Sequence, residues 1–279
     1  MTMLSINTNV GALTAARSSY SVNKSMEQSM ERLASGKRVN GASDDAAGLA
    51  IATRLNAEIN GIHQAVRNAS DAQGMLGVAE GALEQVHALL LRMRELAVQS
   101  ANETVTSADR NMLQTEVAQL ETEIQRIVDD TTWAGITLLA GGFTTGATFQ
   151  IGPRNSDTIQ ISISAIEPLS TVARGGLSLV SHISLQAEAA AYIVNIDNAI
   201  SIISADRATY GAVMNRLDHA MANLQNVATN LSVAKGRIMD ADFAAESSNL
   251  ARTQVLQQAS MAMLAQANAS KQNILSLFQ

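Results

Sequence analysis

The sequence predicts a mainly α-helical protein: an elongated helical bundle or coiled coil with paired terminal helices and a small β-hairpin region. Three observations support this fold class. Apolar residues recur at alternating steps of four and three over long stretches, both chain ends read as helices with very few charges, and one short segment alternates apolar with polar residues. The alternation of four and three is typical of helices that pack along a common seam.

The composition of the 279 residues favours helices and excludes several functions. Hydrophobic residues make up 47% but aromatic residues only 3%, and there are 2 prolines. Such a chain favours long, closely packed helices. The net charge of −6, with no basic cluster longer than Gly36-Lys37-Arg38, argues against nucleic-acid binding. The absence of cysteine excludes disulfides, thiolate metal sites and thiol catalysis.

The first helix is expected from about Thr8 to Ala34, before the break at Asn40-Gly41. Ser43 is then the predicted N-cap of a second helix, with Asp44 and Asp45 in its first turn, where the helix dipole favours acids.

This second helix is expected from Asp44 to Ser100, bent near Gly61 or Gly74. Its second half carries a seam at Met75, Ala79, Ala82, Val86, Leu89, Met93 and Leu96. Gly74, Gly77 and Gly81 lower helix propensity. Either they allow close approach of a neighbouring helix, which we favour, or they reflect sequence drift.

A third helix is expected after the capping box formed by Thr106 and Asp109. Its seam is Leu113, Val117, Leu120, Ile124 and Ile127. Trp133-Ala134-Gly135 closes it, and residues 131–142 are expected to form a loop with an apolar core.

The predicted β-hairpin covers residues 148–164, where Phe149, Ile151, Ile159, Ile161 and Ile163 alternate with polar residues. The longest seam follows, and Arg207 is its only polar member. It comprises Ile196, Ile200, Ile203, Arg207, Tyr210, Met214, Leu217, Met221, Leu224, Ala228 and Leu231. Lys235-Gly236 is expected to end or bend this helix.

The final helix, 238–279, contains an uncharged run from Thr253 to Ser270. Its amide side chains would be unsatisfied in lipid, so a membrane span is not expected. Exposed apolar surface of this extent marks a contact site. The ends are therefore predicted to pack on each other and on other copies of the chain. The N-terminal segment lacks the pattern of a signal peptide, so if the protein lies outside the cell, we expect it to be exported by a route that cleaves no signal.

No complete catalytic, cofactor-binding or metal-binding motif is found, so the protein is not expected to be an enzyme or to need a cofactor. The histidines His63, His87, His182 and His219 lack metal-ligand spacing. Acid–base chemistry at Asp129-Asp130 is the weaker alternative to a solvated loop. Several methionines fall at seam positions, where core packing is favoured over an adaptable groove.

Several ordered blocks at both ends resemble bacterial flagellin, the subunit of the flagellar filament. They include residues 5–9, 31–40, 42–48, 237–246 and 254–259, with Arg92-Met93-Arg94-Glu95-Leu96 and Met263-Leu264-Ala265-Gln266-Ala267-Asn268. The resemblance covers roughly residues 3–165 and 193–279. It implies a self-assembling filament subunit for motility, located outside the cell on the flagellum.

The resemblance also implies a domain organisation. Residues 1–43 with 237–279 would form an inner domain that lines the filament channel. Residues 44–236 would form the outer bundle, in which the short loop 165–183 replaces the outer domains of larger flagellins.

Partners are likewise implied by the resemblance: other copies of the chain, an export chaperone, a filament cap protein and the hook–filament junction protein. The residues assigned to self-assembly or to the chaperone are Val255, Leu256, Ala259, Met263, Leu264, Leu275 and Leu277. A patch at Arg92, Leu96 and Glu116 corresponds to the family's contact with a Toll-like receptor. The alternative function is that of the hook–filament junction protein itself.

Overall fold

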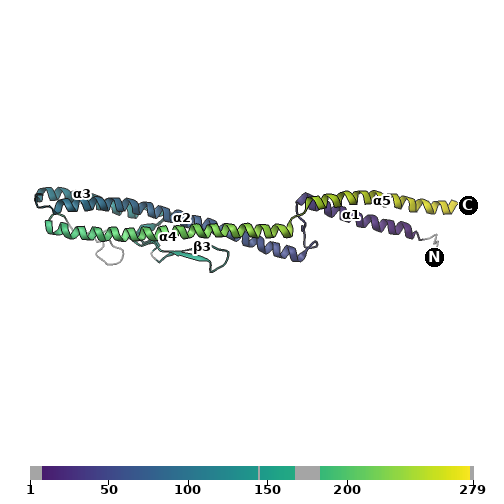
Figure 1. Ribbon diagram of the computed structural model, residues 1–279, viewed down its shortest axis with the longest axis horizontal. Coiled ribbons are helices and arrows are strands. Elements are labelled where there is room, and N and C mark those ends of the chain that lie inside the picture. Colours follow the sequence, from purple (N-terminus) through teal and green to yellow (C-terminus); the bar gives the residue numbers. More distant parts are fainter. Residues whose placement is uncertain (1–7, 144, 167–182, 277–279) are drawn as a thin grey trace. The chain divides into compact units, whose positions relative to one another are not determined.

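The computed structural model describes residues 8–143, 145–166 and 183–276, the last six of these by backbone alone. It is mainly helical, as predicted (Figure 1). The elements in chain order are α1 (Val10–Ser35), α2 (Ala46–Ala101), α3 (Ser107–Asp130), β1 (Thr132–Trp133), β2 (Ile136–Thr137), the π-helical segment η1 (Leu138–Gly142), β3 (Ala147–Gln150), β4 (Thr158–Ile161), α4 (Gln186–Met239) and α5 (Phe243–Ser276).

The chain forms two compact units, and two helices pass from one into the other. Unit 1 contains residues 1–59 and 229–279, and unit 2 contains residues 60–228. The limits of these units lie inside α2 and α4. The first turns of α2 and the last turns of α4 line one cavity in unit 1.

The start of α2 differs from the prediction. Asp45, not Ser43, caps the helix, because its Oδ1 accepts the backbone N–H of Gly48 at 2.8 Å. Asp44 instead accepts the backbone N–H groups of Asn40 and Gly41, and these bonds lower the pKa of its carboxyl. From this start α2 runs without interruption to Ala101.

The seam glycines of α2 have different environments. A Cβ on Gly74 would lie 3.1 Å from the Trp133 ring, so close approach is confirmed there, although the neighbour belongs to β1 rather than to a helix. Nothing lies within 4 Å of such an atom on Gly77 or Gly81, so the prediction of close approach was wrong for these two.

Two other predicted helix boundaries, at Thr106 and at Gly236, had different outcomes. The capping box of α3 is confirmed: Thr106 accepts from the backbone of Asp109, whose side chain accepts from the backbone of Thr106. Gly236, in contrast, does not end α4, which continues to Met239. Asp242 caps the next helix, α5, by accepting the backbone N–H groups of Ala244 and Ala245.

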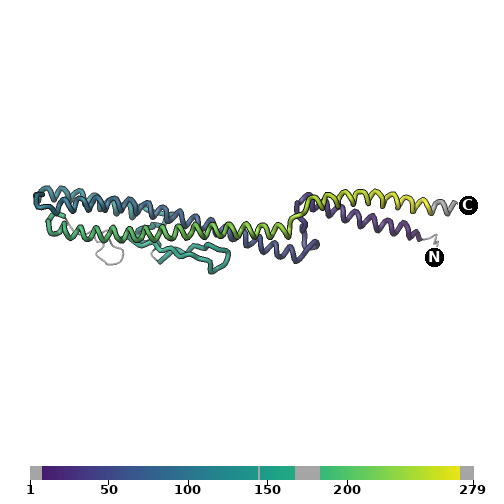
Figure 2. Tube along the Cα trace, viewed as in Figure 1, coloured from purple at the N-terminus to yellow at the C-terminus, as the bar shows by residue number. Residues whose placement is uncertain are grey.

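The predicted seams form the core of unit 2. In Figure 2 the chain can be followed through α2, α3 and α4, which lie alongside one another in this unit. Met75, Val86, Val117, Ile124 and Ile196 are fully buried and belong to one apolar cluster. Other seam positions, such as Leu89, Leu120 and Met214, are half-buried against it.

Arg207, the polar member of the long seam, is accounted for by an ion pair. Its guanidinium donates two hydrogen bonds to Glu80 Oε1, at 3.0 and 2.6 Å. Both side chains are about two-thirds shielded from solvent. The seam of α4 thus gains a bidentate contact to α2 at the one point where it lacks an apolar side chain.

Two small antiparallel hairpins lie between α3 and α4. In the first, Trp133 pairs with Ile136. In the second, which the sequence predicted, Phe149 pairs with Ile159. Ile159, Ile161 and Ile163 are buried, so the alternating segment contributes to the helical core. Most of the predicted loop 165–183 lies outside the described residues.

Neighbouring isoleucines on α4 provide a test of this core. Ile203 is fully buried and Ile202 is 39% exposed. We expect Ile203→Ala to lower the free energy of unfolding by about 2–5 kcal/mol, because it leaves a cavity in the seam. The measurement is urea unfolding of the full chain followed by circular dichroism.

Ile202→Ala is the matched control, since it removes the same atoms from the exposed side of α4. It should cost less than about 1 kcal/mol. Equal losses for the two variants would contradict the burial pattern.

Candidate assembly surface

The terminal helices α1 and α5 of unit 1 lie side by side (Figure 1). Asn9 joins them near the chain ends: its side chain caps α1 by accepting from the Ala12 backbone, and its Nδ2 donates to the Ala267 carbonyl at 3.1 Å. At its other end α1 terminates at Gly36, whose φ of +69° lies in the left-handed region that glycine tolerates.

A buried carboxylate fixes the pair at the opposite end from Asn9. Glu246 of α5 accepts a hydrogen bond from Ser29 Oγ at 2.9 Å and from Arg32 Nη1 at 2.8 Å. The Glu246 residue is 7% exposed. Burial acts to raise the pKa of its carboxyl, but the hydrogen bonds from Arg32, Ser29 and Asn249 and the positive charge of Arg32 together outweigh burial, so the pKa lies below its usual value.

Backbone contacts also join the segments that follow α1 and α4. The Arg38 N–H donates to the Met239 carbonyl at 2.6 Å, and the Ala241 N–H donates to the Gly36 carbonyl at 3.0 Å. Lys37 and Asp240 form an antiparallel bridge between these two hydrogen bonds.

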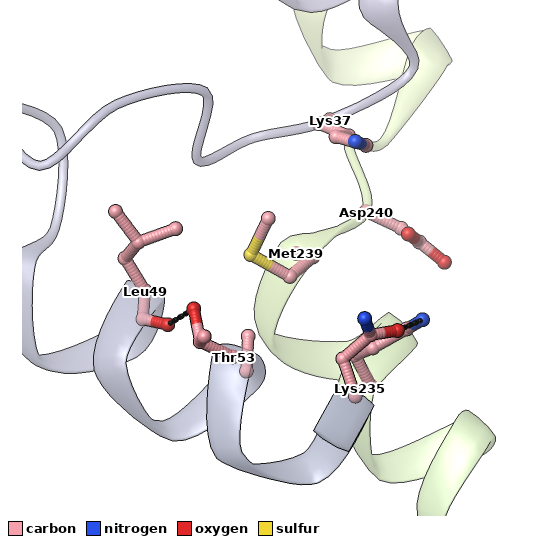
Figure 3. A pocket seen from close by; sticks show the side chains of 8 residues that line it. Lys37, Leu49, Thr53, Lys235, Met239 and Asp240 are labelled. Atoms are coloured by element: carbon pink, nitrogen blue, oxygen red, sulfur yellow. Dashed lines mark hydrogen bonds between the residues drawn. The ribbon is translucent and has the colours of Figure 1, made fainter. Parts of the chain in front are cut away.

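Beside this bridge lies a cavity of about 400 Å³, which the sequence gave no sign of. Figure 3 shows Lys235 donating from Nζ to Asn56 Oδ1, a bond of 3.0 Å, and Met239 standing near Leu49. The cavity is lined by Lys37, Leu49, Ala52, Thr53, Asn56, Lys235, Met239 and Asp240. Most of these residues come from the start of α2 and the end of α4, which are distant in sequence, and Lys37 and Asp240 come from the segments that follow α1 and α4.

Away from their contact, both terminal helices leave large apolar side chains in solvent. On α1 these are Val10, Leu13, Tyr20 and Met30, and on α5 they are Phe243, Val255, Leu256, Met261 and Met263. Val255 is 65% exposed and Tyr20 74% exposed. Apolar surface of this kind marks a contact site on a protein.

A groove of about 610 Å³ runs between α1 and α5. It is lined by Gly11, Thr14, Ala15, Ser18, Leu256, Ala259, Ser260, Met263, Gln266, Ala267 and Ser270. None of these residues carries a charge. Small side chains dominate the lining, which lets another surface approach the backbones closely.

The residues assigned to self-assembly can now be placed. Val255, Leu256, Ala259 and Met263 are exposed, and Leu264 is half-buried. Three of the exposed residues, Leu256, Ala259 and Met263, line the groove. Leu275 lies in α5 but its side chain is not described, and Leu277 lies outside the described residues.

The three residues of the receptor patch lie in unit 2 and differ in exposure. Arg92 of α2 donates to Glu116 of α3, at 2.8 Å from Nη2, and both side chains are about half exposed. Leu96 is 1% exposed and belongs to the core. Arg92 and Glu116 therefore meet at the surface, and Leu96 contributes to the packing of α2.

Other polar groups considered in the sequence are held by structural contacts. Asp130 forms an ion pair with Arg126 at 2.8 Å, and Asp129 accepts from Gln125 at 3.0 Å. His182 lies outside the described residues. Among the residues that the structure describes, no cluster of three potential ligands could hold a metal ion, and no helix has the length and hydropathy to cross a membrane.

Comparison with known proteins identifies relatives over nearly the whole chain. Residues 6–144 match the family described as the bacterial flagellin N-terminal helical region, and residues 193–278 match its C-terminal helical region. A flagellin of Halalkalibacterium halodurans is 40% identical over 276 residues, which is 98% of this chain and 99% of the relative.

Two solved structures are similar to the described fold. The crystal structure of Bacillus cereus flagellin is 32% identical with a TM-score of 0.50, over 61% of this chain and 94% of that one. A protein described as flagellar hook-associated, from Vibrio parahaemolyticus, has a TM-score of 0.62 over 71% of this chain and 100% of that one. Its identity of 19% shows a shared fold alone.

The buried carboxylate predicts a pH dependence within unit 1. Because the pKa of Glu246 is lowered on folding, its contribution to stability is present above the unfolded-state pKa and is lost as pH falls through the folded-state pKa. We expect Glu246→Gln to destabilise the α1–α5 pair by about 1–2 kcal/mol at neutral pH and to remove part of the acid dependence. Hydrogen exchange of the α5 amides as a function of pH measures both effects.

Glu31→Gln serves as the control, since Glu31 is an exposed acid on the same helix as Arg32. It should leave α5 protection unchanged at both neutral and acidic pH. If the two variants behaved alike, the buried contact would not be the source of the acid dependence.

Proposed function

The chain belongs to the bacterial flagellin family and is a structural subunit of the flagellar filament, outside the cell, and on this premise we propose that the exposed faces of α1 and α5 are the surfaces through which it assembles. The observation that carries the proposal is the uncharged groove between the two helices, together with the large apolar side chains that their mutual contact leaves in water. Transfer of such surface out of water is favourable by about 25 cal/mol per Å².

The proposed occupant of the groove is a second copy of the same chain. A filament subunit contacts its neighbours through different patches on its two sides, because heterologous contacts give open helical polymers. An uncharged groove lined by small residues suits a neighbouring helix, whose backbone can approach closely without leaving a buried charge unpaired. In this arrangement Leu256, Ala259 and Met263 lie at the contact between subunits, with Val255 and Leu264 beside them, and the proposal extends to Leu275 and Leu277 of the same helix.

We also propose a division of roles along the sequence. Residues 1–43 and 237–279 form the inner part that lines the filament channel, and residues 44–236 form the part that surrounds it. The uncharged α1–α5 groove and the exposed apolar side chains of the two helices support the first assignment, because neighbouring copies would remove them from water. The charged surface of α2 and α3, with ion pairs such as Arg92–Glu116, supports contact with solvent for the second.

The remaining partners are proposed from the family. An export chaperone would cover the apolar face of α5 before assembly, and the cap and junction proteins would contact the subunit at the filament ends. Export without a cleaved signal peptide belongs to the same proposal. No observation favours a role as the junction protein itself. We further infer that the subunit is not an enzyme, which accords with a family of structural proteins.

A contact with an innate receptor of the Toll-like class is proposed at Arg92 and Glu116. Their side chains are bonded to each other across α2 and α3 and are both accessible, so a receptor can contact them together. Leu96 would act indirectly, by holding α2 in place from within the core.

A charge placed on the exposed face of α5 tests the assembly proposal. We expect Val255→Glu to keep the helicity of the full chain and to raise the critical concentration for polymerisation at least about tenfold, since burial of an unpaired carboxylate is costly. Sedimentation of polymer and electron microscopy measure the outcome.

Val194→Glu is the matched control, because Val194 is also an exposed valine on a long helix, 58% exposed on α4 of unit 2. It should change the critical concentration less than about twofold. Filaments formed equally well by Val255→Glu and the parent chain would overturn the role given to α5.

The receptor proposal predicts that Arg92→Ala weakens activation of a cellular receptor reporter by about tenfold, a loss of roughly 1.4 kcal/mol of binding free energy. Arg126→Ala removes another ion-paired arginine of unit 2, located on α3. This control should activate the reporter like the parent chain, and an unchanged response to Arg92→Ala would contradict the patch.

A further inference from the structure

Met263 combines an exposed sulfur-containing side chain with a place in the α1–α5 groove. It is 64% exposed and lines the groove with Gly11, Thr14 and Ala15 of α1. Met261, two residues earlier, is 56% exposed but is not part of the groove lining. The seam methionines Met75 and Met93 are fully buried in unit 2.

Exposure decides which of these thioethers a small oxidant can reach. Hydrogen peroxide oxidises methionine by transfer of one oxygen atom: the sulfur lone pair attacks one peroxide oxygen, the O–O bond breaks, and the proton on the transferred oxygen passes to the departing hydroxide, which gives methionine sulfoxide and water. The product is polar and carries a strong hydrogen-bond acceptor where an apolar side chain stood before. Reductases specific for methionine sulfoxide reverse the change.

The groove is a poor environment for that product once it is covered. In the free chain the sulfoxide oxygen is hydrated, and a second copy that covers Met263 must remove this water. The Thr14 hydroxyl shares its one proton between the carbonyls of Val10 and Gly11, and the other polar residues of the lining, Ser18, Ser260, Gln266 and Ser270, are uncharged. Oxidation therefore adds a desolvation cost to the assembled state and none to the free subunit.

We propose that Met263 is an oxidation site at which peroxide-class oxidants control incorporation of the subunit into the filament. The unassembled chain is sensitive, since its thioether is exposed, and the assembled chain is protected, since a second copy covers the groove. This inference rests on the proposed assembly role of α5.

The experiment treats purified full-length chain with hydrogen peroxide, locates sulfoxide by peptide mass spectrometry, and compares the critical concentration for polymerisation with that of the same protein left untreated. Oxidation should raise the critical concentration of the parent chain about tenfold. For Met263→Leu, the ratio of the critical concentration after oxidation to that of the untreated variant should stay below about twofold. Methionine sulfoxide reductase should return the oxidised parent chain to its untreated value.

Met112→Leu is the matched control, because Met112 of α3 is 65% exposed and lies in unit 2, outside the proposed assembly surface; its oxidised-to-untreated ratio should equal that of the parent chain. An undiminished ratio for Met263→Leu, or rescue by Met112→Leu, overturns the proposal. So does equal oxidation of Met263 in filaments and in free subunits.

The two proposals fail in different ways. Normal polymerisation of Val255→Glu would overturn the assembly role of α5 whatever oxidation does. If Val255→Glu blocks assembly while Met263→Leu gives no protection, the assembly role stands and only the oxidation site is lost.

Discussion

The properties of unit 1 depend on one geometrical constraint: in a pair of helices, each helix can bury only the stripe of its surface that faces the other helix. The described contact between α1 and α5 uses that stripe for Asn9, Ser29, Arg32 and Glu246, which set the register of the pair. Apolar side chains on the remaining surface, among them Val10, Leu13 and Tyr20 of α1, stay in water. In the proposed assembly a second copy covers this surface and removes it from water, which favours the assembled chain.

Local patterns predicted much of the fold. The four–three seams located the buried face of α2, α3 and α4 because one helical period repeats over many turns, and the capping box at Thr106 needs residues only three apart. The pattern was less informative where two elements meet. Trp133 rather than a helix approaches Gly74, and Asp45 rather than Ser43 caps α2, because the approach and the loop geometry depend on tertiary contacts.

The contacts that define the candidate surface were the hardest to predict from one sequence. Arg32 and Glu246 are 214 positions apart, and nothing in either segment identifies the other as its partner. The cavity beside Lys235 likewise joins the start of α2 to the end of α4. What could be predicted was the chemical character of the ends, since an uncharged run such as Thr253–Ser270 is visible without knowledge of its partner.

Because the α1–α5 groove lacks charged residues, we expect an added polar group to have a different effect there than on the surface of unit 2. On the surface of unit 2, exposed arginines form ion pairs with acidic residues, as Arg94 does with Asp197 and Arg126 with Asp130. A polar atom added to this surface would stay hydrated. In the α1–α5 groove no lining residue is charged, so a new polar atom has no ionic partner once a second copy covers it. A carboxylate at Val255 and a sulfoxide at Met263 therefore act through one physical cause, the loss of hydration on assembly. The uncharged groove through which the terminal helices are proposed to associate therefore also makes assembly sensitive to the addition of a single oxygen atom.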